Sequence, residues 1–139
     1  MERSDKQRVL VVDDDREIVA AIVRLLEREG IETIAAYNGR EAVERLTENE
    51  IHLIIIDIMM PEMRGDELCH ILKNDIETSH IPIILLTALN TDKNIIEGLQ
   101  SGADEYIVKP FNIGILRANI ANLLTNRALL RHKYTSLDL

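Results

Sequence analysis

Aliphatic runs alternate along the chain with segments whose apolar residues recur at helical spacing. The runs are rich in β-branched residues and predict five strands, near residues 8–12, 31–37, 52–57, 82–87 and 104–108. The amphipathic segments predict five helices, near residues 16–29, 40–49, 66–74, 91–101 and from 112 onward. Strands that alternate with helices are typical of βαβ units. The sequence therefore predicts the α/β class, with a doubly wound parallel sheet.

The apolar positions also predict which side of each helix faces the sheet. In the helix over residues 91–101, the inner residues are expected to be Ile95, Ile96 and Leu99. In the last helix they are expected to be Ile113, Leu116, Ile120 and Leu123. Each set recurs every three or four residues and so forms one stripe along its helix.

One stretch combines a buried strand with a charged residue. Four aliphatic residues precede Asp57, and an apolar segment follows it and ends at Pro61. Such a run is typical of a parallel strand that is buried on both faces. A carboxylate beside so much apolar surface costs free energy unless it is paired or binds a cation. Because ligands of open α/β sheets bind at the carboxyl ends of the strands, Asp57 is the leading candidate for a functional residue.

Other reactive side chains are predicted at the same edge of the sheet. They are Asp13 and Asp14 after the first strand, Thr87 at the end of the fourth, and Lys109 after the fifth. The three carboxylates would repel one another unless a divalent cation lay among them, and an oxygen-only ligand set with room for water suits Mg²⁺. The set predicts a phosphoryl-acceptor site with Asp57 as the nucleophile. Lys109 and the metal would neutralise phosphoryl oxygens, and Thr87 would donate a hydrogen bond.

The charge of the chain is unevenly spread. Its 139 residues carry a net charge of −8, although residues 112–139 have four basic residues and one acid. The acidic body argues against direct nucleic-acid binding and is compatible with a bound cation. No uncharged apolar run approaches the roughly 20 residues that span a bilayer, so no membrane contact is expected. A single cysteine, Cys69, and the lack of a signal-peptide core predict a cytoplasmic location.

Each candidate residue also has an ordinary structural explanation. The acidic residues Asp13, Asp14 and Asp15 could form a solvated turn that caps the next helix. Thr87 could serve only as a strand residue, and Lys109 only as a surface lysine. The four histidines share no ligand spacing, so a zinc site is not expected.

Two rival classes of protein also place a reactive site at this edge. A dehalogenase-type phosphatase needs a second aspartate two residues after the nucleophile, where this chain has Met59. A flavodoxin-like FMN carrier needs a loop of serine, threonine or glycine after the first strand, where three aspartates would repel phosphate. Local chemistry disfavours both.

Over residues 8–124 the chain resembles the receiver domain of two-component response regulators. The matching segments are Val-Leu-Val-Val-Asp-Asp at 9–14, Asp-Ile-Met-Met-Pro at 57–61, Leu-Thr-Ala at 86–88, Tyr106, and Lys-Pro-Phe at 109–111. Their order and spacing together are highly specific. The resemblance implies a flavodoxin-like fold with strand order 2-1-3-4-5 and five helices. It also implies that Asp57 accepts a phosphoryl group from the phosphohistidine of a histidine kinase, as a regulatory phosphoacceptor rather than a turnover enzyme.

The same resemblance implies roles for individual residues. Asp13 and Asp14 match the acidic pair, with Asp14 as the more direct metal ligand, and the backbone carbonyl of Met59 would complete the protein's share of the coordination. Thr87 and Tyr106 match the switch positions, whose movement alters the face around the fourth helix, the fifth strand and the fifth helix. That face would control an output, expected to be transcription, and phosphorylation would favour a homodimer.

Two apolar side chains bear on the lifetime of the phosphorylated state. Met59 and Leu89 lie two residues after Asp57 and Thr87, positions that flank the path of hydrolytic water in the family. Both are bulky here, so we expect them to shield an acyl phosphate and make it comparatively long-lived.

The ends of the chain extend beyond the region of resemblance. Residues 1–7 are predicted to be a linker, and residues 125–139 a helical extension of the last helix. With the loop Glu-Thr-Ser-His-Ile-Pro at 77–82, this extension resembles receivers embedded in hybrid sensor kinases. The histidine kinase would then lie in the same polypeptide, and a DNA-binding output domain would follow residue 139.

Overall fold

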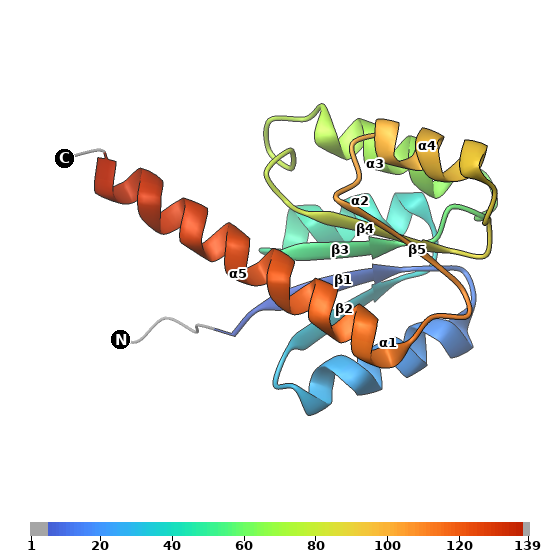
Figure 1. Cartoon of the computed structure of the whole chain (residues 1–139), viewed down its shortest axis with the longest axis horizontal. Helices are drawn as coiled ribbons and strands as arrows, with labels where there is room; N and C mark the ends of the chain where they lie inside the picture. The colour runs from blue at the N-terminus through green and yellow to red at the C-terminus, as the bar shows by residue number, and fades with distance from the viewer. Residues whose placement is uncertain (1–5, 138–139) are drawn as a thin grey trace.

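The computed structural model describes residues 6–137, with side chains up to residue 127, and contains one five-stranded parallel sheet in the order β2-β1-β3-β4-β5 (Figure 1). The strands are β1 (Arg8–Val12), β2 (Glu32–Ala36), β3 (Leu53–Ile56), β4 (Ile83–Thr87) and β5 (Glu105–Val108). The helices are α1 (Arg16–Arg28), α2 (Gly39–Glu48), α3 (Gly65–Lys73), α4 (Asp92–Gln100) and α5 (Ile113–Leu137). The predicted fold class and strand order are confirmed.

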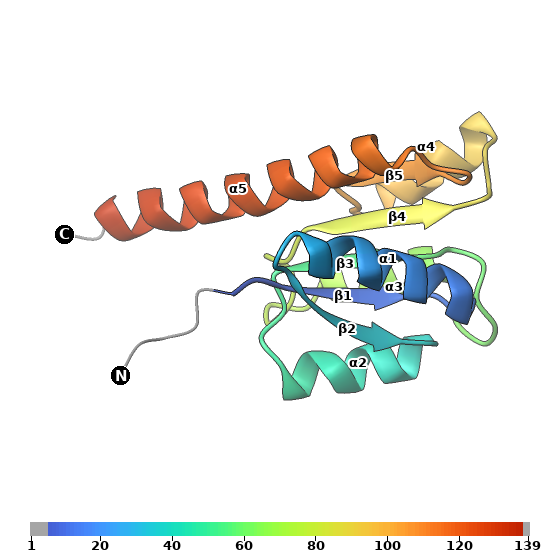
Figure 2. The same cartoon turned by 90° about the horizontal axis from the view of Figure 1, so that it is seen from below.

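Alternate residues of each strand enter two separate cores, one on each face of the sheet. On one face, Leu10, Ile54 and Leu85 pack with residues of α2 and α3. On the other, Val11 and Ile55 pack with residues of α1 and α5. Figure 2 shows α1 and α5 on one side of the sheet and α3 and α4 on the other. The central strands β3 and β4 are buried on both faces, and all of their positions except Thr87 are aliphatic.

The register of the strands brings their carboxyl ends to one edge. Val12 pairs with Ile56, and Thr87 pairs with Val108. The backbone N–H of Asp57 donates to the carbonyl of Val12 at 3.0 Å, which places the residues that follow β1 and β3 side by side. Residues from four loops therefore meet at this edge.

Two expected helix faces are partly wrong. Ile96 and Leu99 of α4 are 54% and 44% exposed, and the buried residue of this helix is Gly98. The helix lies over the edge strand β5, so little of the sheet is beneath it to cover a full stripe. In α5, Leu116 and Ile120 are buried and Leu123 is half-buried, but Ile113 in the first turn is 55% exposed.

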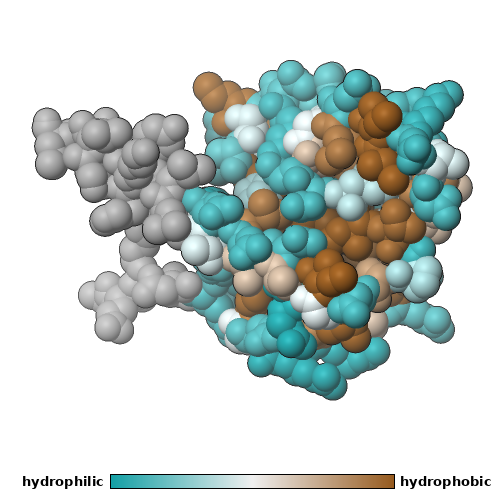
Figure 3. Space-filling view, in the orientation of Figure 1, coloured by the Kyte–Doolittle hydropathy of each residue, from teal (hydrophilic) through white to brown (hydrophobic). Residues whose placement is uncertain are grey.

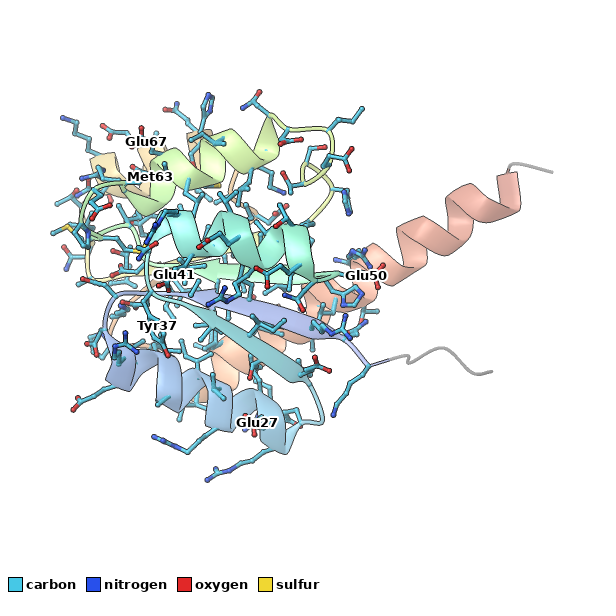
Figure 4. All side chains as sticks on the ribbon, turned by 180° about the vertical axis from the view of Figure 1, so that it is seen from behind. Glu27, Tyr37, Glu41, Glu50, Met63 and Glu67 are labelled. Atoms are coloured by element: carbon cyan, nitrogen blue, oxygen red, sulfur yellow. The ribbon has the colours of Figure 1, made fainter. Side chains whose placement is uncertain are left out.

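A polar cluster lies at the opposite, amino-terminal edge of the sheet. The buried His52 accepts a hydrogen bond on Nδ1 from the backbone N–H of Arg8 at 2.9 Å, and its Nε2 lies 3.3 Å from Glu50 Oε1. Figure 4 shows Glu50 beside α5, the helix that carries Arg127. Burial lowers the pKa of His52, and the nearby charges of Arg127 and Arg8 lower it further, while Glu50 acts in the opposite direction.

The helix α5 is 25 residues long, or roughly 37 Å at about 1.5 Å per residue, and continues past the sheet (Figure 1). Among the described residues, no helix has the length and apolar character that crossing a membrane requires.

Candidate functional site

Three carboxylates meet at the carboxyl edge of the sheet. Asp13, Asp14 and Asp57 each present an oxygen, and these oxygens all lie within 4.8 Å of one another. Asp13 and Asp57 are buried, at 3% and 7% exposure, whereas Asp14 is exposed. The grouping follows from the pairing of β1 with β3, because Asp13 and Asp14 are the first two residues after β1 and Asp57 is the first after β3.

Lys109 reaches into this group from the end of β5. Its Nζ donates to Asp13 Oδ2 at 2.9 Å and lies 3.7 Å from Asp57 Oδ2. The backbone N–H of Lys109 donates to the carbonyl of Thr87 at 2.8 Å, which holds the base of the side chain against β4. One ammonium group thus faces two buried carboxylates and leaves an excess of negative charge.

The excess of negative charge affects the pKa of Asp57. Burial raises the pKa of the Asp57 carboxyl, and the neighbouring Asp13 raises it further. Lys109, the backbone N–H of Met59 and the hydroxyl of Thr87 lower it without cancelling the rise. A set of carboxylate oxygens with unbalanced charge fits a hard divalent cation such as Mg²⁺, with the exposed Asp14 on the open side of the site.

The segment after β4 connects the site to Tyr106. Thr87 is fully buried, and its Oγ1 accepts a weak hydrogen bond from the backbone N–H of Leu89 at 3.4 Å. The carbonyl of the same residue, Leu89, accepts from the hydroxyl of Tyr106 at 2.8 Å. Tyr106 is half-buried, and burial raises the pKa of its hydroxyl. The two residues expected to act as a switch are thus joined through one backbone segment.

The structure places Met59 at the rim of the site. Its backbone N–H lies 3.4 Å from Asp57 Oδ1, while its side chain is 55% exposed. The position of its carbonyl as a metal ligand stays a prediction.

Gly65 contributes to the site in a way that the sequence did not indicate. It begins α3, and a methyl group at this position would collide with the backbone carbonyl of Asp57 and with the Ile56 side chain. Its N–H donates to the carbonyl of Ile58 at 2.9 Å. The close approach to Asp57 depends on tertiary packing that no local pattern reveals.

Comparison with known proteins agrees with this geometry. The profile of the response regulator receiver domain family matches residues 9–121. The chain is 38% identical over 129 residues to the transcriptional regulatory protein CpxR of Escherichia coli. This alignment covers 93% of this chain and 51% of CpxR. It is 43% identical over 132 residues to histidine kinase P4 of Formosa agariphila. This alignment covers 95% of this chain and 10% of P4.

Solved structures show the same fold. The receiver domain of the Francisella response regulator 1452 aligns with a TM-score of 0.80 at 39% identity and covers 87% of this chain and 98% of that chain. The signal receiver domain of a signal transduction histidine kinase from Syntrophus aciditrophicus aligns with a TM-score of 0.81 at 37% identity, over 86% of this chain and 91% of that chain. The chain spans about half the length of CpxR and a tenth of the length of histidine kinase P4. It belongs to the response regulator receiver domain family.

Proposed function

We propose that the chain is a phosphorylation-dependent signalling switch in which Asp57 accepts a phosphoryl group from the phosphohistidine of a histidine kinase. The observation that carries the proposal is the position of the buried Asp57 between two further carboxylates and the Lys109 ammonium. In the transfer, a P–O bond forms to an Asp57 oxygen as the P–N bond of phosphohistidine breaks, and the imidazole leaves with the electron pair.

The surrounding residues assist this transfer. Asp13, Asp14, Asp57 and the Met59 carbonyl would hold Mg²⁺, which when bound supplies positive charge to the phosphoryl oxygens. Lys109 shifts part of its contact from Asp13 to the incoming phosphoryl group, because that group carries more negative charge than one carboxylate. Thr87 donates its hydroxyl hydrogen to a phosphoryl oxygen. The chain therefore assists its own phosphotransfer and dephosphorylation, but does not turn over a free substrate.

The output surface is the face formed by α4, β5 and α5. Apolar residues gather over α4, β5 and the start of α5 (Figure 3), and they include the exposed side chains of Ile96, Leu99 and Ile113. Movement of Thr87 toward the phosphoryl group is transmitted through Leu89 to Tyr106, which lies beneath this face. A second copy of the chain, or an output domain, would then bind the altered surface.

The remaining partners are proposed from the relatives and the charge of the chain. Residues 8–124 form the receiver domain, residues 1–7 a linker, and residues 125–139 an extension that leads toward a DNA-binding output domain that regulates transcription. Residues 1–5 and 138–139 lie outside the described residues. The kinase would be a separate cytoplasmic protein or part of the same polypeptide, as in histidine kinase P4. DNA contact would fall to the output domain, because the body of the chain is acidic.

Intact mass after incubation with acetyl phosphate tests this function. We expect one added phosphoryl group in the wild type with Mg²⁺, none after chelation, and none in Asp57→Asn. An adduct that persists in Asp57→Asn would show that another residue is the acceptor.

A further inference from the structure

Gly98 occupies an unusual position in α4. Every residue of this helix is described, and Gly98 alone among them is buried. Glycine in a helix interior is less favourable than alanine, and the φ angle of Gly98 is not one that requires glycine. The residue therefore needs another explanation.

The explanation lies in the Tyr106 ring. A methyl group at Gly98 would lie 2.6 Å from Tyr106 Cε2, 2.7 Å from Tyr106 Cδ2 and 3.1 Å from Leu85 Cδ1. The first two distances are shorter than real Cβ contacts, so an alanine would require the ring or the helix to move. The ring cannot yield freely, because its hydroxyl donates to the carbonyl of Leu89 at 2.8 Å.

The contact completes a chain of neighbours from Asp57 to the helix. The Thr87 hydroxyl interacts with Asp57 and accepts a hydrogen bond from the backbone N–H of Leu89. The carbonyl of Leu89 accepts a hydrogen bond from the Tyr106 hydroxyl, and the Tyr106 ring lies against Gly98. Since Gly98 is the only buried residue of α4, the helix rests on the sheet mainly where the ring lies. A ring that turned outward would remove this support.

We propose that Gly98 is a positioning residue that makes room for the Tyr106 ring beneath α4 and thereby makes the position of α4 depend on that ring. This role rests on the proposed function, in which Tyr106 reports the state of Asp57. Gly98 itself touches neither Asp57 nor the carboxylates, so it should affect the coupling and not the chemistry.

The test compares Gly98→Ala with Gly114→Ala in the full chain without phosphorylation. Gly114 is a second helical glycine, but a methyl group there would meet only Asn112 Oδ1, at 3.1 Å. We expect Gly98→Ala to lower the Tm in the wild-type background and to raise it in a Tyr106→Ala background, where the ring is gone and the helix preference of alanine remains. Gly114→Ala should change the Tm in the same direction in both backgrounds. A higher Tm for Gly98→Ala in both backgrounds would overturn the proposal.

NMR of ¹³C-labelled tyrosine gives a direct reading of the ring. The Tyr106 signal, assigned by its loss in Tyr106→Phe, should shift toward that of a solvent-exposed tyrosine in Gly98→Ala and stay in place in Gly114→Ala. An unshifted signal in Gly98→Ala would contradict the proposal. Both glycine variants should still gain the acetyl phosphate adduct. Lack of an adduct in the wild type would refute the proposed function. It would not affect what the Tyr106 NMR signal shows about the position of the ring.

Discussion

Lys109 Nζ donates a hydrogen bond to Asp13 Oδ2 at 2.9 Å and so joins two residues that are 96 positions apart in the chain. The bond connects the end of β5 to the end of β1, across the two strands that lie between them in the sheet. Both side chains are nearly buried, at 16% and 5% exposure, so the pair is only weakly screened by solvent. The same ammonium group therefore links two strands of the sheet and is also placed to neutralise the charge of a phosphoryl group.

Replacing Lys109 tests this double role. We expect Lys109→Met to lower the free energy of unfolding by about 1–3 kcal/mol in the absence of divalent cations, because it leaves buried carboxylates without their donor. The variant should also gain little acetyl phosphate adduct. Chemical denaturation of the matched variant Lys93→Met is the control. Lys93 is 84% exposed with Glu97 4.0 Å away, so its removal should cost no more than about 0.5 kcal/mol. Equal losses in the two variants would contradict the account.

A divalent cation should stabilise the folded chain. At a Mg²⁺ concentration ten times its Kd, we expect the free energy of unfolding to rise by about 1.4 kcal/mol, because the cation binds the folded state and not the dispersed carboxylates of the unfolded chain. Thermal unfolding with and without Mg²⁺ measures the rise, and a chelator should reverse it. The double variant Asp13→Asn with Asp14→Asn should lose it, whereas Asp92→Asn at the exposed start of α4 should not. A rise of equal size in the double variant would place the cation elsewhere.

His52 should make stability depend on pH. The Arg8 N–H occupies Nδ1, so the neutral imidazole carries its proton on Nε2, and a second proton would break the bond to Arg8. The charged groups that face it are Arg8 of β1, Glu50 before β3 and Arg127 of α5. Because the pKa of His52 is lower in the folded chain than the ordinary 6.5, the unfolded chain binds the proton more tightly. The stability that the neutral His52 contributes is fully present above pH 6.5. It is lost as the pH falls from 6.5 toward the lower pKa that His52 has in the folded chain.

Denaturation between pH 7.5 and 5.5 measures this contribution. His52→Asn, whose side-chain oxygen can still accept from Arg8, should lose less stability over this range than the wild type. His70→Asn, which removes an exposed imidazole, is the control. If His52→Asn and the wild type lost stability equally, His52 would not be the group that titrates.

The lifetime of the phosphorylated state should depend on Met59 and Leu89. The backbone N–H of Met59 lies 3.4 Å from Asp57 Oδ1, and that of Leu89 lies 3.4 Å from Thr87 Oγ1, so both residues are next to the site. Polar side chains at these positions could orient water toward an acyl phosphate. We expect Met59→Asn with Leu89→Glu to shorten the half-life of the phosphorylated chain at least about tenfold. The decay of the mass adduct after removal of acetyl phosphate measures it. A wild-type half-life of seconds, unchanged in the variant, would refute the shielding role.

Much of the architecture could be predicted from local pattern, and the exceptions share a cause. The aliphatic run at residues 53–56 indicates a strand buried on both faces, and the acids after two such strands indicate one shared edge. Helical spacing indicates which residues share a face of α4, but not how much sheet lies beneath it, so Ile96 and Leu99 were expected to be buried and are exposed. The Nδ1 partner of His52 is a backbone N–H that lies 44 residues earlier, and the contact of Gly98 is with a ring from the next strand. Such contacts depend on packing between elements, which no local pattern contains.

Identification of the phosphorylated residue tests the central claim most directly. After incubation with acetyl phosphate and Mg²⁺, borohydride reduces an acyl phosphate to an alcohol, and so converts a phosphorylated aspartate to homoserine. Peptide mass spectrometry should then find homoserine at Asp57 and aspartate at Asp13 and Asp14. Homoserine at either of these two positions, or unmodified aspartate at Asp57 in a chain that carries the adduct, would contradict the assignment of Asp57 as the acceptor.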